Sequence, residues 1–112
     1  MCTKSQLEAI EEEMVNYYRS VYGDSIDTII LYGSYARGDY SDDSDIDITA
    51  IVRGNRVELQ KKLKKMWDFS TEVGLAYDVI ISPTVITYDE FEQYKEKLPY
   101  YRNIVKEGRK IG

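Results

Sequence analysis

Hydrophobic residues near the start of the chain recur three and four positions apart, which is the spacing of one face of an α-helix. They are Leu7, Ile10, Met14, Tyr17 and Val21. Thr3 and Gln6 precede them at the spacing of a capping box, in which each side chain accepts a hydrogen bond from the other residue's backbone N–H. The pattern predicts a helix that begins just after Thr3.

Three short stretches have the residue composition of β-strands. Residues 28–32 are rich in β-branched side chains and end at Gly33. Residues 45–52 alternate between polar and apolar side chains, and residues 76–81 form a third, mostly apolar run. We therefore predict three strands.

Helical spacing returns twice. Between the second and third strands, possible capping residues precede an apolar stripe: Asn55 and Glu58, then Leu59, Leu63 and Met66. After the third strand the same arrangement is repeated: Thr87 and Glu90, then Phe91, Tyr94 and Leu98. Pro99 suits the first turn of a last short helix. The predicted order is helix, strand, turn, strand, helix, strand, helix, helix.

Length and composition are those of a small globular protein. The chain has 112 residues, of which 43% are hydrophobic and 31% are charged, so we expect a single domain over residues 1–112. Its net charge of −5 gives no general attraction to phosphates or anionic lipid, and we expect no direct binding of nucleic acid. No apolar run approaches the roughly 18 residues of a membrane span, and no apolar signal segment opens the chain. These features predict a cytoplasmic protein.

Histidine is absent and Cys2 is the only cysteine. Ser-His and Cys-His nucleophile pairs are therefore excluded, as are an internal disulfide and a cysteine-based zinc site. Carboxylates remain as the candidate metal ligands or bases.

Asp45 and Asp47 lie two positions apart on a predicted strand, so their side chains point to the same face. Their Cα atoms should be roughly 6.6 Å apart, which allows both carboxylates to reach one cation. Without a cation they would repel each other, whereas Mg²⁺ is commonly held by one or two carboxylates together with substrate phosphates. Taken alone, an Asp-x-Asp motif is more often a solvated strand end.

Gly33 and Ser34 directly follow the first strand and open a short helical turn through Arg37. Glycine lets a ligand approach the backbone closely, exposed N–H groups attract phosphate, and the Ser34 hydroxyl can add a hydrogen bond. An isolated Gly-Ser is usually a plain turn. Beside a pair of carboxylates, however, it supplies the phosphate contact that a metal-dependent phosphoryl or nucleotidyl transfer requires.

Asp78 lies inside the apolar run 76–81, where a carboxylate is costly unless it is paired or bound to metal. A strand beside residues 45–52 would bring it to the same site, as a metal ligand and as the general base for an attacking hydroxyl. The alternative is a strand-edge aspartate that faces water.

The spacing of these motifs resembles that of the nucleotidyltransferase superfamily that includes DNA polymerase beta. Gly33-Ser34 is followed by ten residues and then by Asp45-Ile46-Asp47, with Asp78 further on. The segment GSYARGDYSDDSDIDI is most similar to the minimal nucleotidyltransferases, small prokaryotic proteins that are paired with HEPN-domain ribonuclease toxins. The closing YYRNIVKEGRKIG is similar to the short helical end of that family.

The resemblance implies an α/β (α+β) fold with a mixed β-sheet flanked by helices. It further implies that Asp45, Asp47 and Asp78 bind two Mg²⁺ ions and that Gly33 and Ser34 hold the phosphates of ATP. Arg37 would steady the triphosphate, or else pair with Asp39 or Asp42 on the surface.

The activity implied is that of an antitoxin that transfers AMP from ATP to a tyrosine of its HEPN-domain toxin. Two alternatives remain at this point: a binding module that blocks the toxin sterically, and an enzyme that adenylylates a small hydroxylated metabolite. The chain also has eleven tyrosines, including the pair Tyr100-Tyr101, which suit either the rim of a core or a partner surface.

Overall fold

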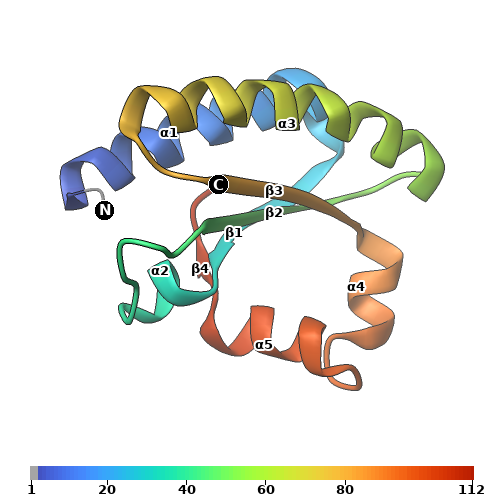
Figure 1. The fold of residues 1–112 in the computed structure, drawn as a ribbon. Coiled ribbons are helices and arrows are strands. Elements are labelled where there is room, and N and C mark those ends of the chain that lie inside the picture. Colours follow the sequence, from blue (N-terminus) through green and yellow to red (C-terminus); the bar gives the residue numbers. More distant parts are fainter. Residues whose placement is uncertain (1–2) are drawn as a thin grey trace.

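The computed structural model describes residues 3–112; Met1 and Cys2 lie outside the described residues. Within that part of the chain a mixed four-stranded sheet divides the helices into two layers (Figure 1). The strands are β1 (Ile26–Tyr32), β2 (Ile46–Val52), β3 (Ile81–Thr87) and β4 (Arg109–Lys110). Their spatial order is β3-β2-β1-β4, with β1 antiparallel to β2 and β4, and β2 parallel to β3. The predicted fold class is confirmed.

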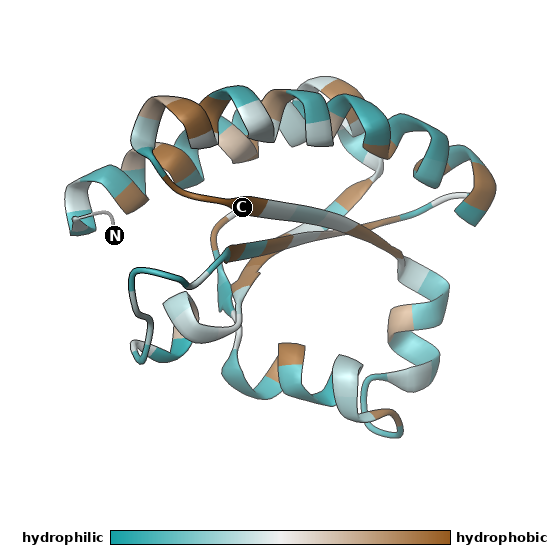
Figure 2. Cartoon of the chain, viewed as in Figure 1, coloured by the Kyte–Doolittle hydropathy of each residue, from teal (hydrophilic) through white to brown (hydrophobic). Residues whose placement is uncertain are grey.

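Two long helices cover one face of the sheet, α1 (Lys4–Tyr22) and α3 (Arg56–Tyr77), and a short 3-10 turn, η1 (Gly23–Ser25), leads from α1 into β1. The opposite face carries α2 (Ser34–Arg37), α4 (Tyr88–Tyr94) and α5 (Pro99–Glu107). In Figure 2 the apolar stretches are concentrated in the strands, whereas the helices alternate between apolar and polar segments along their length. No helix in residues 3–112 has both the length and the apolar character needed to cross a membrane.

The predicted caps define the helix starts. Thr3 and Gln6 form both hydrogen bonds of the capping box at α1. The Asn55 side chain accepts hydrogen bonds from the first turn of α3, the Thr87 hydroxyl accepts one from Glu90 N at α4, and a proline occupies the first turn of α5. The sequence-based prediction of these four starts is confirmed.

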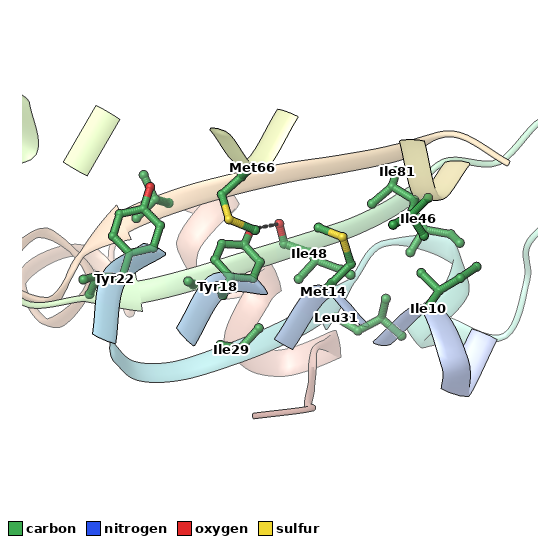
Figure 3. Packing of buried hydrophobic residues seen from close by; sticks show 14 of the residues in the cluster. Ile10, Met14, Tyr18, Tyr22, Ile29, Leu31, Ile46, Ile48, Met66 and Ile81 are labelled. Atoms are coloured by element: carbon green, nitrogen blue, oxygen red, sulfur yellow. Dashed lines mark hydrogen bonds between the residues drawn. The ribbon is translucent and has the colours of Figure 1, made fainter. Parts of the chain in front are cut away.

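The main core lies between the sheet and the two long helices (Figure 3). Its fully buried side chains include Ile10, Met14 and Tyr18 of α1, Ile29 and Leu31 of β1, Ile46 and Ile48 of β2, and Met66 of α3. The Tyr18 hydroxyl donates to the backbone oxygen of Thr84 at 2.8 Å and lies 3.3 Å from that of Ile48, and burial raises the pKa of this phenol. Tyr18 therefore ties α1 to both parallel strands.

The predicted strand over residues 76–81 is wrong. α3 continues to Tyr77, and β3 begins only at Ile81. Asp78 ends the helix in the left-handed conformation, with φ 56°, and Val79 N donates to the Gly74 carbonyl at 3.0 Å. A Cβ at Gly74 would lie only 2.5 Å from the Val79 oxygen, so this glycine permits the tight helix end.

Candidate functional site

The turn after β1 lies directly against a carboxylate of β2. Gly33 has φ 76° and ψ −157°, a conformation that favours glycine. A Cβ at this position would collide with Asp47 Oδ2, so any other residue would require the carboxylate to move. The antiparallel register pairs Tyr32 with Asp47 and so places the turn and the carboxylate side by side. The structure thus brings Gly33 and Asp47 together, and Ser34 follows Gly33 as the first residue of α2.

Asp47 is partly buried, and its electrostatic surroundings disfavour a negative charge. Burial is the largest cause that raises the pKa of its carboxyl group, and the charge of Asp45 raises it further, while Arg37 acts in the opposite direction. Asp45 precedes the first residue of β2 and is close enough to repel Asp47. A cation between the two carboxylates would remove this repulsion.

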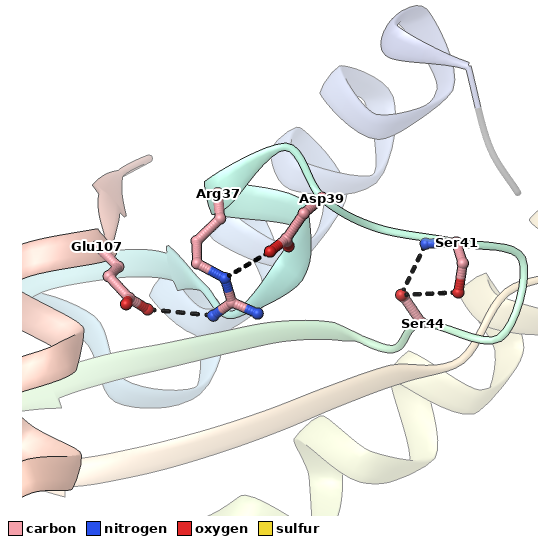
Figure 4. A network of polar contacts seen from close by, with 5 residues as sticks. All are labelled: Arg37, Asp39, Ser41, Ser44 and Glu107. Atoms are coloured by element: carbon pink, nitrogen blue, oxygen red, sulfur yellow. Dashed lines mark hydrogen bonds and ion pairs between the residues drawn. The ribbon is translucent and has the colours of Figure 1, made fainter.

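Arg37 forms ion pairs on both sides of its helical turn (Figure 4). Its Nε donates to Asp39 Oδ2 at 3.2 Å, and its Nη1 donates to Glu107 Oε2 at 3.1 Å. These hydrogen bonds raise the pKa of the guanidinium group. The structure thus shows the surface pairing with Asp39 that was the alternative to a triphosphate contact, and the contact with Glu107 links α2 to the last turn of α5.

A hollow of about 180 Å³ lies between this turn and α5. It is lined by Tyr32, Gly33, Arg37, Tyr100, Asn103, Ile104 and Glu107. Binding sites for whole ligands usually exceed 300 Å³. The hollow therefore has room for part of a nucleotide, with the guanidinium of Arg37 in its wall.

Two tyrosines that sequence reasoning did not assign to the site meet in this hollow. The hydroxyls of Tyr32 and Tyr100 are 3.0 Å apart, and their rings pack edge to face with centroids 6.1 Å apart. Burial, and then the hydrogen bond to Tyr100, raise the pKa of Tyr32 well above its usual range. The position of Tyr32 immediately before the glycine turn was the available signal, whereas the sequence does not show where Tyr100 lies.

Asp78 lies near Asp45 but apart from Asp47. It lines a separate hollow that contains Asp45 but not Asp47, formed by Asp42, Asp43, Ser44, Asp45, Gly74, Leu75, Asp78, Val79 and Ile80. Over residues 3–112, no three Asp, Glu, His or Cys side chains are grouped so as to hold a metal. The strand positions paired with Asp47 and Thr49 across β3 are Ser82 and Thr84. The structure therefore couples Asp45 with Asp47 and places Asp78 in a hollow that it shares with Asp45 alone of the two.

Comparison with known proteins identifies the class of protein. The chain matches the family model described as nucleotidyltransferase domain over residues 8–111, and it belongs to that family. It is 38% identical over 98 residues to a Methanocaldococcus jannaschii protein named "Putative protein adenylyltransferase MJ0604", covering 88% of this chain and 90% of the relative. A second protein of that organism, "Putative protein adenylyltransferase MJ0141", is 33% identical over 97 residues, covering 79% of this chain and 96% of the relative.

Solved structures share the fold. A crystal structure of a toxin–antitoxin with AMP-PNP matches with a TM-score of 0.54 and 16% identity, covering 90% of this chain and 72% of the other. A tri-AMPylated HEPN toxin of Shewanella oneidensis in complex with MNT antitoxin matches with a TM-score of 0.53 and 15% identity, covering 94% and 71%. At this identity the likeness establishes the fold. Together with the family match and the archaeal relatives, it agrees with the predicted place among the minimal nucleotidyltransferases of the polymerase beta-like superfamily.

Proposed function

We propose that this nucleotidyltransferase transfers AMP from ATP to a tyrosine of a HEPN-domain toxin and thereby acts as an antitoxin. The observation that carries the proposal is the contact of the Gly33 turn with the Asp47 carboxylate, because it puts a phosphate-binding backbone beside a metal-binding group. The relatives named as protein adenylyltransferases support nucleotidyl transfer to a protein. The AMPylated HEPN toxin found with an MNT antitoxin of similar fold supports the choice of partner.

Asp45 and Asp47 are the residues that would hold Mg²⁺. Their hard oxygen ligands suit this ion, and their mutual repulsion is what a cation would relieve. Two carboxylates are sufficient when phosphate oxygens complete the coordination, so the absence of Asp78 from the pair does not prevent binding. The bound ion would supply positive charge to the phosphates of ATP.

The protein's own groups would position the nucleotide. The backbone at Gly33 and the hydroxyl of Ser34 would contact phosphate oxygens, and Arg37 would face the triphosphate from the wall of the hollow. The acceptor oxygen then attacks the α-phosphorus, and the bond to pyrophosphate breaks. The acceptor proton leaves to one of the two carboxylates or to water.

A phenol suits this site better than an aliphatic alcohol. The carboxylates that could take the acceptor proton, Asp45 and Asp47, are also those assigned to the metal, and a nearby cation weakens a carboxylate as a base. A tyrosine hydroxyl has a pKa of about 10, and it loses its proton far more readily than serine or a sugar hydroxyl. The two-carboxylate site is therefore consistent with a tyrosine acceptor.

The dependence of ATP binding on Mg²⁺ tests this arrangement. ATP at about 100 times its dissociation constant should add roughly 2.7 kcal/mol to the free energy of unfolding when Mg²⁺ is present. We expect the gain to be largely lost with excess chelator, because the carboxylates would then face phosphate without a cation. Thermal unfolding with ATP in both conditions gives the comparison, and equal shifts would contradict the proposed site.

A further inference from the structure

Tyr100 presents an accessible phenol to the hollow beside the glycine turn. It lies in the first turn of α5, is 48% exposed, and shares the hollow with Gly33 and Arg37. The Tyr32 hydroxyl, 3.0 Å away, and the Tyr32 ring hold it in place. The Tyr100 hydroxyl is therefore both fixed in position and open to a ligand in the hollow.

Two contacts relate Tyr100 to the carboxylate that we assign to the metal. Tyr32, its hydrogen-bond partner, is the cross-strand partner of Asp47. Gly33, which lines the same hollow as Tyr100, lies against Asp47 Oδ2. A nucleotide that touches the turn and the carboxylate would thus have the Tyr100 hydroxyl as a neighbour.

We propose that Tyr100 is a site of self-adenylylation, a modification that rests on the proposed function because it uses the same bound ATP. The Tyr100 oxygen forms a bond to the α-phosphorus, the bond between this phosphorus and the oxygen of pyrophosphate breaks, and the phenolic proton goes to a carboxylate or to water. The products are AMP-Tyr100 and pyrophosphate. No oxidant or further reactant is required.

Neighbouring tyrosines are less suited to this reaction. The Tyr101 ring packs against Phe91 and Tyr94, and its hydroxyl is directed to Glu90 Oε2 at 3.5 Å. Tyr32 is partly buried and its hydroxyl is bonded to that of Tyr100. Tyr100 combines exposure with a place in the hollow, so modification should stop at one AMP per chain.

The attached nucleotide would also occupy the hollow itself. Its phosphate would lie close to Arg37, in the space that the triphosphate of another ATP needs. Modified protein should therefore bind fresh ATP more weakly than unmodified protein.

The experiment incubates the purified full chain with ATP and Mg²⁺ in the absence of any partner, followed by intact mass measurement and tandem mass spectrometry. The expected result is a single AMP increment on Tyr100. Tyr100→Phe should lose the increment, and Tyr101→Phe, a matched change at the adjacent tyrosine, should retain it. Asp47→Asn should also lose it.

Calorimetric titration of the same protein with ATP and Mg²⁺ separates the two proposals. If ATP binds in a Mg²⁺-dependent manner but Tyr100 stays unmodified, the self-adenylylation proposal is overturned and the proposed function stands. An increment on another residue also overturns it. If the protein neither binds ATP nor becomes modified, both proposals fail.

Discussion

At Gly33 the backbone and the Asp47 carboxylate share a space that a single methyl group would fill. We expect Gly33→Ala to lower the free energy of unfolding by about 1–3 kcal/mol and to abolish AMP transfer, because the new Cβ must displace Asp47. Denaturant unfolding and a transfer assay measure the two effects.

Gly38→Ala is the matched control for this change. Gly38 also has a positive φ, of 86°, but an added Cβ would have no atom within 4 Å. The Gly38→Ala variant should therefore be less stable than wild type but still transfer AMP. Equal loss of transfer in both variants would show that the contact with Asp47 is not what matters.

The raised pKa of Asp47 predicts how the stability of the protein depends on pH. Its pKa in the folded protein is above the unfolded value of about 3.9, so ionisation is more costly in the folded state. The contribution of Asp47 to stability is therefore lost as the pH rises from the pKa of this residue in the unfolded protein through its pKa in the folded protein. The Asp47→Asn variant has no ionisable group at this position and does not lose stability in this way. Its free energy of unfolding, relative to that of the wild type, should therefore increase over this pH interval.

Urea unfolding of both proteins between about pH 3.5 and 7 checks this prediction, since the interval begins near the unfolded pKa. A difference that stays constant or falls over this range would mean that the surroundings of Asp47 do not disfavour its charge. In the same samples Asp47→Asn should fail to transfer AMP.

At the scale of elements, the sequence predicted most of the architecture because its helix starts carry strong local signals. The hydrogen bonds at Thr3, Asn55 and Thr87 depend on residues next to one another in the chain, and all three caps are present. The run at 76–81 was misassigned because its first residues end a helix and its last residue begins a strand. Apolar composition alone does not distinguish these two states in a short run.

The site was predicted in part for a related reason. Gly33 and Asp47 were found because both belong to one local motif, in which an antiparallel register closes the space between them. Asp78 was misplaced together with its strand. Tyr100 reaches the hollow only through the packing of α5 against β1, a long-range contact that no local pattern reveals.

The corrected end of α3 predicts how Asp78 behaves. Asp78→Asn should leave AMP transfer unchanged, because Asp78 does not share a hollow with Asp47. It should also raise the free energy of unfolding by about 0.5 kcal/mol, since a negative charge at a helix C-terminus is unfavourable and asparagine tolerates the left-handed conformation.

Asp45→Asn provides the comparison for Asp78→Asn. Asp45 lines the same hollow as Asp78 but is also coupled to Asp47. Single-turnover AMP transfer should therefore be lost in Asp45→Asn and preserved in Asp78→Asn. A loss of transfer in Asp78→Asn with the fold intact would restore the third carboxylate to the active site.

In the whole molecule, the sheet separates the main hydrophobic core on one face from the candidate functional site on the other. α1 and α3 cover the face that holds the main core, and α2 and α5 flank the opposite face, where the turn, Arg37 and the tyrosine pair meet. A partner that offers a tyrosine would approach this second face. We expect this approach to end in the transfer of AMP to the partner.

Intact mass spectrometry of a HEPN-domain partner, co-expressed once with the wild-type chain and once with Asp47→Asn, measures this transfer. We expect the partner to gain mass in multiples of AMP with the wild-type chain and to remain unmodified with the variant. A partner that co-purifies tightly with the wild-type chain yet carries no added mass would contradict transfer, and would indicate an antitoxin that acts by blocking alone.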